Sequence, residues 1–233
     1  KFATVSADVG HWYHPKSKEK WQFLIFVDEG SKFRVARMIN QGQRKHISAG
    51  QFLSQLREAW ISYFGTPHTL RLDPDGAFRS HEISEFCDWQ EIFLDIIPGE
   101  APWKLNSCER SIESIKYLLE KIVTDHPDVS APDALSDIIR ILNSKDNIRG
   151  HSPLQHVMGR TPDVAGRFFS TVDPSCPELT CLEPRAMQQE NWERMATAEK
   201  ALIDWQCQQR ISRATNSRHR QVLEIWCISG ENN

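Results

Sequence analysis

Three carboxylates are spaced so that a mixed α/β fold would bring them together. Asp8 lies in a strand-like segment, Asp73 ends another, and Glu109 falls in the first turn of a long amphipathic helix. Functional side chains of α/β folds gather at strand ends and adjoining loops, so we expect these three to meet. Because like charges raise one another's pKa, such a cluster makes sense when divalent cations neutralise it. The pattern predicts a site for two Mg²⁺ or Mn²⁺ ions that would activate an attacking oxygen in phosphodiester chemistry.

The segments that must position these residues follow the order β-β-β-α-β-α-β-α-α. The run 21–28 is almost entirely apolar, which is typical of a strand buried on both faces. Apolar residues at spacings of three and four indicate the helices. We expect strands at 4–9, 21–28, 34–39, 68–73 and 93–97, and helices at 52–64, 80–91, 106 or 107 to 124, and 133–142. The fold class is therefore α/β, with a five-stranded mixed sheet and flanking helices.

The length of 233 residues fits one substantial core with an extension. A content of 8 Trp and 11 Phe excludes wholesale disorder, and no run approaches the ~20 apolar residues of a membrane span. We expect the core over 1–170, a proline-punctuated linker over 171–186 and a helical extension with a basic end over 187–221. The strand-like segment 222–233 has no partner strand and resembles the beginning of a domain cut short.

The charge and cysteine content exclude two further classes of protein. The net charge of −3 argues against a purely electrostatic nucleic-acid binder, although an enzyme could meet nucleic acid with one face. The six cysteines contain no C-x-x-C pair, and His11 and His14 have no cysteine pair at zinc-finger spacing. We therefore expect no structural zinc, and reduced thiols in an intracellular protein.

Several separated segments resemble the catalytic cores of retroviral and LTR-retrotransposon integrases. Residues 74 to 108, 35 in all, separate Asp73 from Glu109, which is the D,D-35-E spacing of that family. The resemblance covers residues 4–162. Its motifs are VDEGSKF (27–33), like "D..S+"; LRLDPDGAF (70–78), like "D-x-G-x-x-F"; IPGEAPWKLNSCERSIESIK (97–116), like "SP.H.QSNG..ER....LK"; and GHSPLQHVMGRTP (150–162), like "G.SP....GR.P".

The resemblance implies a ribonuclease H-like fold and a polynucleotidyl transferase that processes DNA 3′ ends and joins them to target DNA. The implied metal ligands and catalytic residues are Asp8, Asp73 and Glu109. Asp75 is an alternative to Asp73, because the family's Gly usually follows the Asp by two positions whereas Gly76 follows Asp73 by three.

The resemblance also suggests residues that contact DNA. Lys116, two turns into the long helix, could meet a phosphate, although a solvated lysine is equally consistent with its position. Asn106 begins the helix and Lys104 precedes it. Ser107 replaces the family's Gly, and we expect it to weaken a close backbone approach to DNA. The basic stretch 210–220 is either a DNA-binding arm or a solvated helix end.

The resemblance further implies DNA as the partner, a dimer or higher oligomer, no membrane partner, and action in the nucleus on chromosomal DNA. Segment 222–233 would then be the truncated start of the family's C-terminal β-barrel. Two alternatives stay open. A decayed or domesticated copy would serve as a DNA- or protein-binding scaffold, and a ribonuclease H-like nuclease would share the site chemistry.

Overall fold

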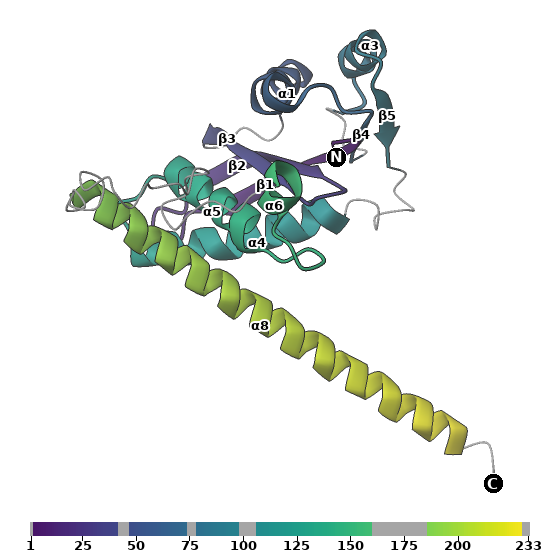
Figure 1. Ribbon diagram of the computed structural model, residues 1–233, viewed down its shortest axis with the longest axis vertical. Helices are drawn as coiled ribbons and strands as arrows, with labels where there is room; N and C mark the ends of the chain where they lie inside the picture. The colour runs from purple at the N-terminus through teal and green to yellow at the C-terminus, as the bar shows by residue number, and fades with distance from the viewer. Residues whose placement is uncertain (1, 42–46, 74–77, 98–105, 160–185, 230–233) are drawn as a thin grey trace, which may run out of the picture.

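A mixed five-stranded sheet forms the centre of the protein (Figure 1). The computed structural model describes residues 2–41, 47–73, 78–97, 106–159 and 186–229. The strands are β1 (Thr4–Tyr13), β2 (Lys20–Asp28), β3 (Arg34–Gln41), β4 (Thr69–Leu72) and β5 (Phe93–Ile96), in the order β3-β2-β1-β4-β5. β1, β2 and β3 pair antiparallel, whereas β4 lies parallel to both β1 and β5. This is the predicted mixed sheet, with every predicted strand of the core present.

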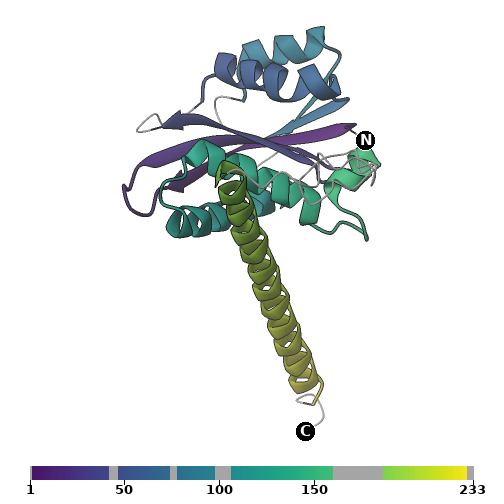
Figure 2. The ribbon, with the colours of Figure 1, turned by 60° about the vertical axis from the view of Figure 1, so that its left-hand side comes forward.

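Helices cover both faces of the sheet (Figures 1 and 2). They are α1 (Ala49–Leu56), the π-helical turn η1 (Arg57–Ile61), α2 (Ser62–Phe64), α3 (His81–Trp89), α4 (Asn106–Asp125), α5 (Ala131–Lys145), α6 (Pro153–Met158) and α8 (Ala186–Ser229). α1 and α3 lie on one side, and α4 and α5 lie on the other. The layered arrangement encloses two apolar cores, one on each side of the sheet.

The β2 strand shows why its sequence is almost continuously apolar. Successive side chains of a strand point to opposite faces. Phe23, Ile25 and Val27 pack in the core beneath α4 and α5, whereas Leu24 and Phe26 pack in the core beneath α1 and α3. Since both faces are covered, neither set could be polar without leaving a buried group to be satisfied.

The short helix α6 was not predicted, although the sequence carries its signals. Ser152 accepts a hydrogen bond from the Gln155 backbone while the Gln155 side chain accepts one from the Ser152 backbone, which is a capping box. Pro153 occupies the first helical position, and Gly159 ends the helix in the left-handed conformation at φ 69°. A search for these cap signals would have found the helix.

The prediction of a strand at the C-terminal end is wrong. α8 runs through residues 222–229 as helix, so this part of 222–233 does not begin a β-barrel in the structure. A lone strand leaves its backbone groups unpaired, whereas a helix satisfies them internally. The predicted helical extension over 187–221 lies entirely within α8. Residues 171–185 of the predicted linker lie outside the described residues, and Ala186 already belongs to α8.

Only the first part of α8 rests on the core. Ala198, Ala201 and Leu202 are buried in the apolar core beside α4 and α5, and the helix then extends away from the domain (Figures 1 and 2). Two ion pairs support this packing: Arg194 with Asp137 at 3.1 Å and Lys145 with Glu199 at 2.8 Å. Among the helices of the described ranges, none is both long and apolar enough to span a membrane.

Candidate active site

Asp8 lies on β1, and Asp73 directly follows the neighbouring strand β4 at the matching position. β1 and β4 are parallel, and Ala7 pairs with Leu72 in their register. Asp8 and Asp73 are the next residues along each chain, and adjacent strands lie about 4.8 Å apart. The sheet register therefore places two of the three predicted carboxylates beside each other.

Glu109 reaches this position from α4. The helix packs on β1 and β2, and Cys108 beside Glu109 is fully buried while Glu109 itself is exposed. The helix face that packs inward is the one predicted: Ile112, Ile115, Leu118, Leu119 and Ile122 are all buried. Burial of that face fixes how the first turn of α4 is presented to the sheet.

The charges of Asp73 and Glu109 both act on the Asp8 carboxyl. The pKa of Asp8 is raised from 3.8 to about 6, and burial is the largest cause. The charges of Asp73 and Glu109 act in the same direction. A hydrogen bond of 2.6 Å from the Val9 backbone N–H and the nearby charge of Lys116 act in the opposite direction. The Asp8 carboxyl is therefore influenced by the charges of the other two carboxylates and of Lys116.

The carboxylate oxygens of the three residues suit a hard divalent cation, but they do not surround a single position. Within the described ranges, no three Asp, Glu, His or Cys side chains are grouped tightly enough to hold a metal ion. Carboxylate oxygens are the donors that Mg²⁺ prefers. A cation between Asp8 and its neighbours would offset the repulsion that now raises the pKa of Asp8, so the residues present fit such an ion chemically.

The other predicted site residues divide into placed and unplaced ones. Lys116 is half-buried and near Asp8, as its effect on the pKa of that carboxyl shows. Asp75 and Lys104 lie outside the described residues. Asn106 is the first residue of α4, but its side chain also lies outside them.

Asp28 closes the turn between β2 and β3. One carboxylate oxygen accepts from the Phe2 backbone N–H at 3.0 Å. The other accepts from the Ser31 backbone N–H at 2.8 Å and from the Ser31 hydroxyl at 2.6 Å. These bonds explain why the "D..S+" segment needs an acid and a serine three residues apart.

The same turn holds a polar cluster that the sequence did not reveal. Glu29 Oε1 accepts a hydrogen bond from the Ser6 hydroxyl at 2.5 Å, and Glu29 Oε2 accepts one from the Ser107 hydroxyl at 2.7 Å. Lys32 Nζ lies 2.5 Å from Glu29 Oε2 and 2.6 Å from Ser107 Oγ. Lys32 belongs to the "D..S+" segment, but nothing in the spacing of the sequence indicates that Glu29 contacts Ser107.

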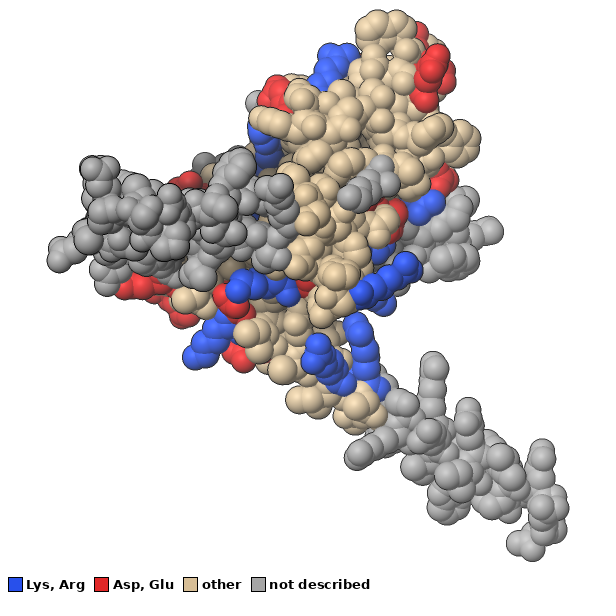
Figure 3. All heavy atoms as spheres, in the orientation of Figure 1, with Lys and Arg blue, Asp and Glu red and all other residues tan. Residues whose placement is uncertain are grey.

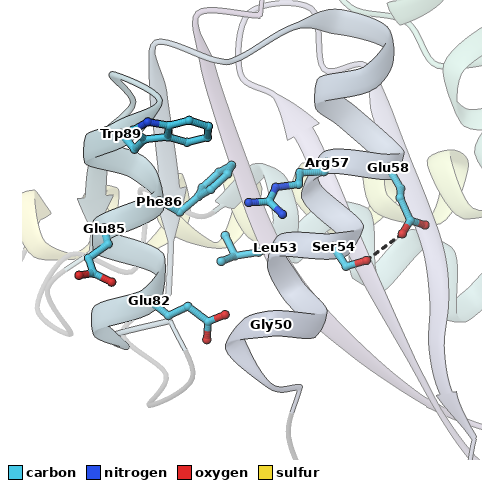
Figure 4. Close-up of a pocket in the computed structure, with 9 residues that line it drawn as sticks. All are labelled: Gly50, Leu53, Ser54, Arg57, Glu58, Glu82, Glu85, Phe86 and Trp89. Atoms are coloured by element: carbon cyan, nitrogen blue, oxygen red, sulfur yellow. Dashed lines mark hydrogen bonds between the residues drawn. The ribbon is translucent and has the colours of Figure 1, made fainter.

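Two hollows in the described part of the chain lie away from these carboxylates. One of about 560 Å³ separates α1 and η1 from α3 on the opposite side of the sheet from α4 (Figure 4). In it the Arg57 guanidinium lies 4.7 Å from the centre of the Phe86 ring, and Glu82 points toward Gly50. Arg210 and Arg213 of α8 are exposed. Figure 3 shows Lys and Arg side chains around the place where α8 leaves the domain.

Solved structures share this arrangement of sheet and helices. The HTLV-2 integrase catalytic core in complex with magnesium matches with a TM-score of 0.54 and 24% identity, over 65% of this chain and 93% of that one. The chain has the fold of a retroviral integrase catalytic core. The integrase core of BIV matches over 68% of this chain and 95% of its own, with a TM-score of 0.53 and 21% identity.

A longer integrase chain shows the same fold. It comes from the simian T-cell lymphotropic virus intasome in complex with the PP2A regulatory subunit B56 gamma, and it matches with a TM-score of 0.57 and 21% identity over 65% of this chain and 52% of that one. Neither a protein-family model nor a curated protein matches the sequence. In this chain Asp8 lies on β1, Asp73 directly follows β4, and Glu109 lies in the first turn of α4.

Proposed function

We propose that the chain is the catalytic core of an integrase-type polynucleotidyl transferase of a retrotransposon. It would process DNA 3′ ends and transfer them to target DNA, with Asp8, Asp73 and Glu109 as metal ligands. The observation that carries the proposal is the parallel register of β1 with β4, which sets Asp8 beside Asp73 on an integrase fold. The charges of Asp73 and Glu109, both of which act on Asp8, support it. Three acids that repel one another are costly to the fold unless a cation uses them.

The residues present would hold two Mg²⁺ or Mn²⁺ ions. When bound, such ions activate an attacking oxygen and stabilise the leaving oxygen of a phosphodiester. The chain itself contributes the positions of its carboxylates: Asp8 is fixed by the β1–β2 and β1–β4 pairings, and Glu109 by the buried face of α4. Magnesium in the HTLV-2 core structure supports the choice of metal.

Lys116 would hold the DNA backbone near the carboxylates. It is half-buried beside Asp8, so its ammonium is available both to the acidic cluster and to a phosphate that approaches it. The exposed Arg210 and Arg213 of α8 would add a second, less specific contact with DNA. Action on chromosomal DNA would place the protein in the nucleus, and the dimeric and trimeric HTLV-2 core structures support an oligomer.

A metal-dependent strand-transfer assay with the full chain tests the proposal. Glu109→Gln keeps the size of the side chain and removes its charge, so we expect cleavage and strand transfer in Mg²⁺ to fall by at least about a hundredfold. Glu120→Gln, an exposed glutamate farther along α4, is the matched control and should keep activity. Undiminished activity of Glu109→Gln would refute the proposal.

One observation favours a second candidate, a non-catalytic scaffold that binds DNA or protein. Within the described residues no three ligands are already grouped around one position. A scaffold would bind DNA without any requirement for Mg²⁺, and calorimetric titration with Mg²⁺ would detect no binding that depends on Asp8. If the protein binds Mg²⁺ and Asp8→Asn abolishes that binding, the scaffold hypothesis is rejected.

A further inference from the structure

The carboxylate of Glu29 bridges the two chain segments that carry Asp8 and Glu109. Its Oε1 accepts from Ser6, two residues before Asp8 on β1, and its Oε2 accepts from Ser107, two residues before Glu109 on α4. Residues two apart in a strand point to the same face, so Ser6 and Asp8 project together toward α4. A single side chain therefore joins the strand and the helix immediately beside both candidate ligands.

The bridge is too enclosed to be an ordinary surface ion pair. Ser6 is fully buried, and the side chains of Glu29 and Lys32 are 19% and 31% exposed. Burial by itself raises the pKa of Glu29, but the hydrogen bonds from Lys32, Ser6 and Ser107 outweigh it and lower that pKa below its ordinary value. The charged form of Glu29 is thus the one that the surrounding donors stabilise.

The contact with Ser107 acts where α4 needs support. The first four N–H groups of a helix have no partners within it, so the first turn is the part that opens most readily. The next turn of α4 makes a second set of hydrogen bonds. The Ser111 hydroxyl donates to the Ser107 carbonyl at 2.7 Å and accepts from Arg34 Nε at 2.9 Å. Both ties hold the backbone on either side of Glu109.

We propose that Glu29 is a positioning residue that sets the distance between the Asp8 and Glu109 carboxylates through its hydrogen bonds to Ser6 and Ser107. The inference rests on the proposed function for the role of those two carboxylates. Glu29 itself is not a ligand; its oxygens are engaged by the two hydroxyls and by Lys32. Loosening the bridge would leave the fold intact but spread the ligands.

Two variants of the full chain test this role. Ser107→Ala removes one hydroxyl, and Glu29→Gln removes the charge that holds Lys32 and both serines. Ser107→Thr restores a hydroxyl, and Ser144→Ala is the control, because Ser144 donates to the Arg140 carbonyl in α5, away from the bridge. The readouts are the affinity for Mg²⁺ alone by calorimetry, and hydrogen exchange of amides 110–113, which bond to the carbonyls of the first turn of α4.

Ser107→Ala and Glu29→Gln should each lower Mg²⁺ affinity by about tenfold and speed exchange of those amides by about as much. Ser107→Thr should stay near the unaltered protein, and the thermal midpoints should match that of Ser144→Ala. Unchanged Mg²⁺ affinity in both variants overturns the positioning role while leaving the proposed function standing. Absence of Mg²⁺ binding by the unaltered protein removes the proposed function itself, and the positioning role with it.

Discussion

The Ser107 hydroxyl donates a hydrogen bond to Glu29 Oε2 across 2.7 Å, although 78 positions separate the two residues in the chain. The integrase motif that this segment resembles usually has glycine where Ser107 stands, and glycine offers no side chain for such a bond. We expected serine in place of glycine at position 107 to weaken a DNA contact. In the structure Ser107 also makes a hydrogen bond that supports the fold. It ties the start of α4 to the turn after β2.

The raised pKa of Asp8 predicts a stability that falls as pH rises. The native carboxyl has a pKa of about 6, above its ordinary 3.8, so the folded state binds the proton more tightly between these values. The contribution of Asp8 to the unfolding free energy should therefore decrease from pH 4 to pH 7. Asp8→Asn, which cannot ionise, should stabilise the protein at pH 7.5 by about 1–3 kcal/mol and much less at pH 3.5. Thermal melts at both pH values in metal-free buffer measure this, and an equal effect at the two would contradict it.

Lys116 and Lys121 lie on the same helix but have different surroundings. Lys116 is near Asp8, whereas the exposed Lys121 lies 5.7 Å from the centre of the Tyr117 ring. If Lys116 holds a phosphate, Lys116→Gln should weaken DNA binding and reduce the slope of log K against log salt by about 1. Lys121→Gln should leave the slope unchanged. Fluorescence anisotropy at about 50 to 200 mM salt measures the slope for each variant. If the two variants have equal slopes, Lys116 does not contact the DNA backbone.

Arg34 is a buried arginine that joins β3, α4 and α5. Its Nη2 lies 2.7 Å from Asp146 Oδ2 and its Nε donates to Ser111, while its side chain is only 9% exposed. Arg34→Met should cost about 3–5 kcal/mol of unfolding free energy, because Asp146 loses its buried partner. Arg37→Met is the control: Arg37 is 46% exposed and pairs with Glu58 at 3.8 Å, so its loss should cost less than about 1 kcal/mol. Equal losses of unfolding free energy for the two variants in chemical denaturation would contradict this structural role of Arg34.

Two adjacent residues of α8 test whether the helix is part of the folded core. Leu202 is 2% exposed in the apolar core, whereas Ile203 is 53% exposed. Leu202→Ala should cost about 2–5 kcal/mol, and Ile203→Ala about 0.5 kcal/mol or less. Equal losses in denaturant melts would show that α8 does not pack on α4 and α5 as the structure places it.

The sequence by itself determined the elements of the core and the candidate carboxylates. Apolar alternation and spacings of three and four mark buried faces, and burial in this fold follows those faces closely, as the strand β2 and the helix α4 show. Its local signals were incomplete at two places. Apolar spacing does not indicate the short helix α6, which is marked by its capping box at Ser152. The apolar stretch 222–228 has the composition of a strand but lacks the partner that a strand requires.

Tertiary structure alone decided which distant residues meet. The parallel register of β1 with β4 sets Asp8 beside Asp73, and the packing of α4 brings Glu109 and Lys116 within the field of Asp8. The contacts of Glu29 follow from the same packing. Hydrogen bonds between residues far apart in the chain leave no periodicity in the sequence, because they depend on distances that exist only after the sheet and its helices have assembled.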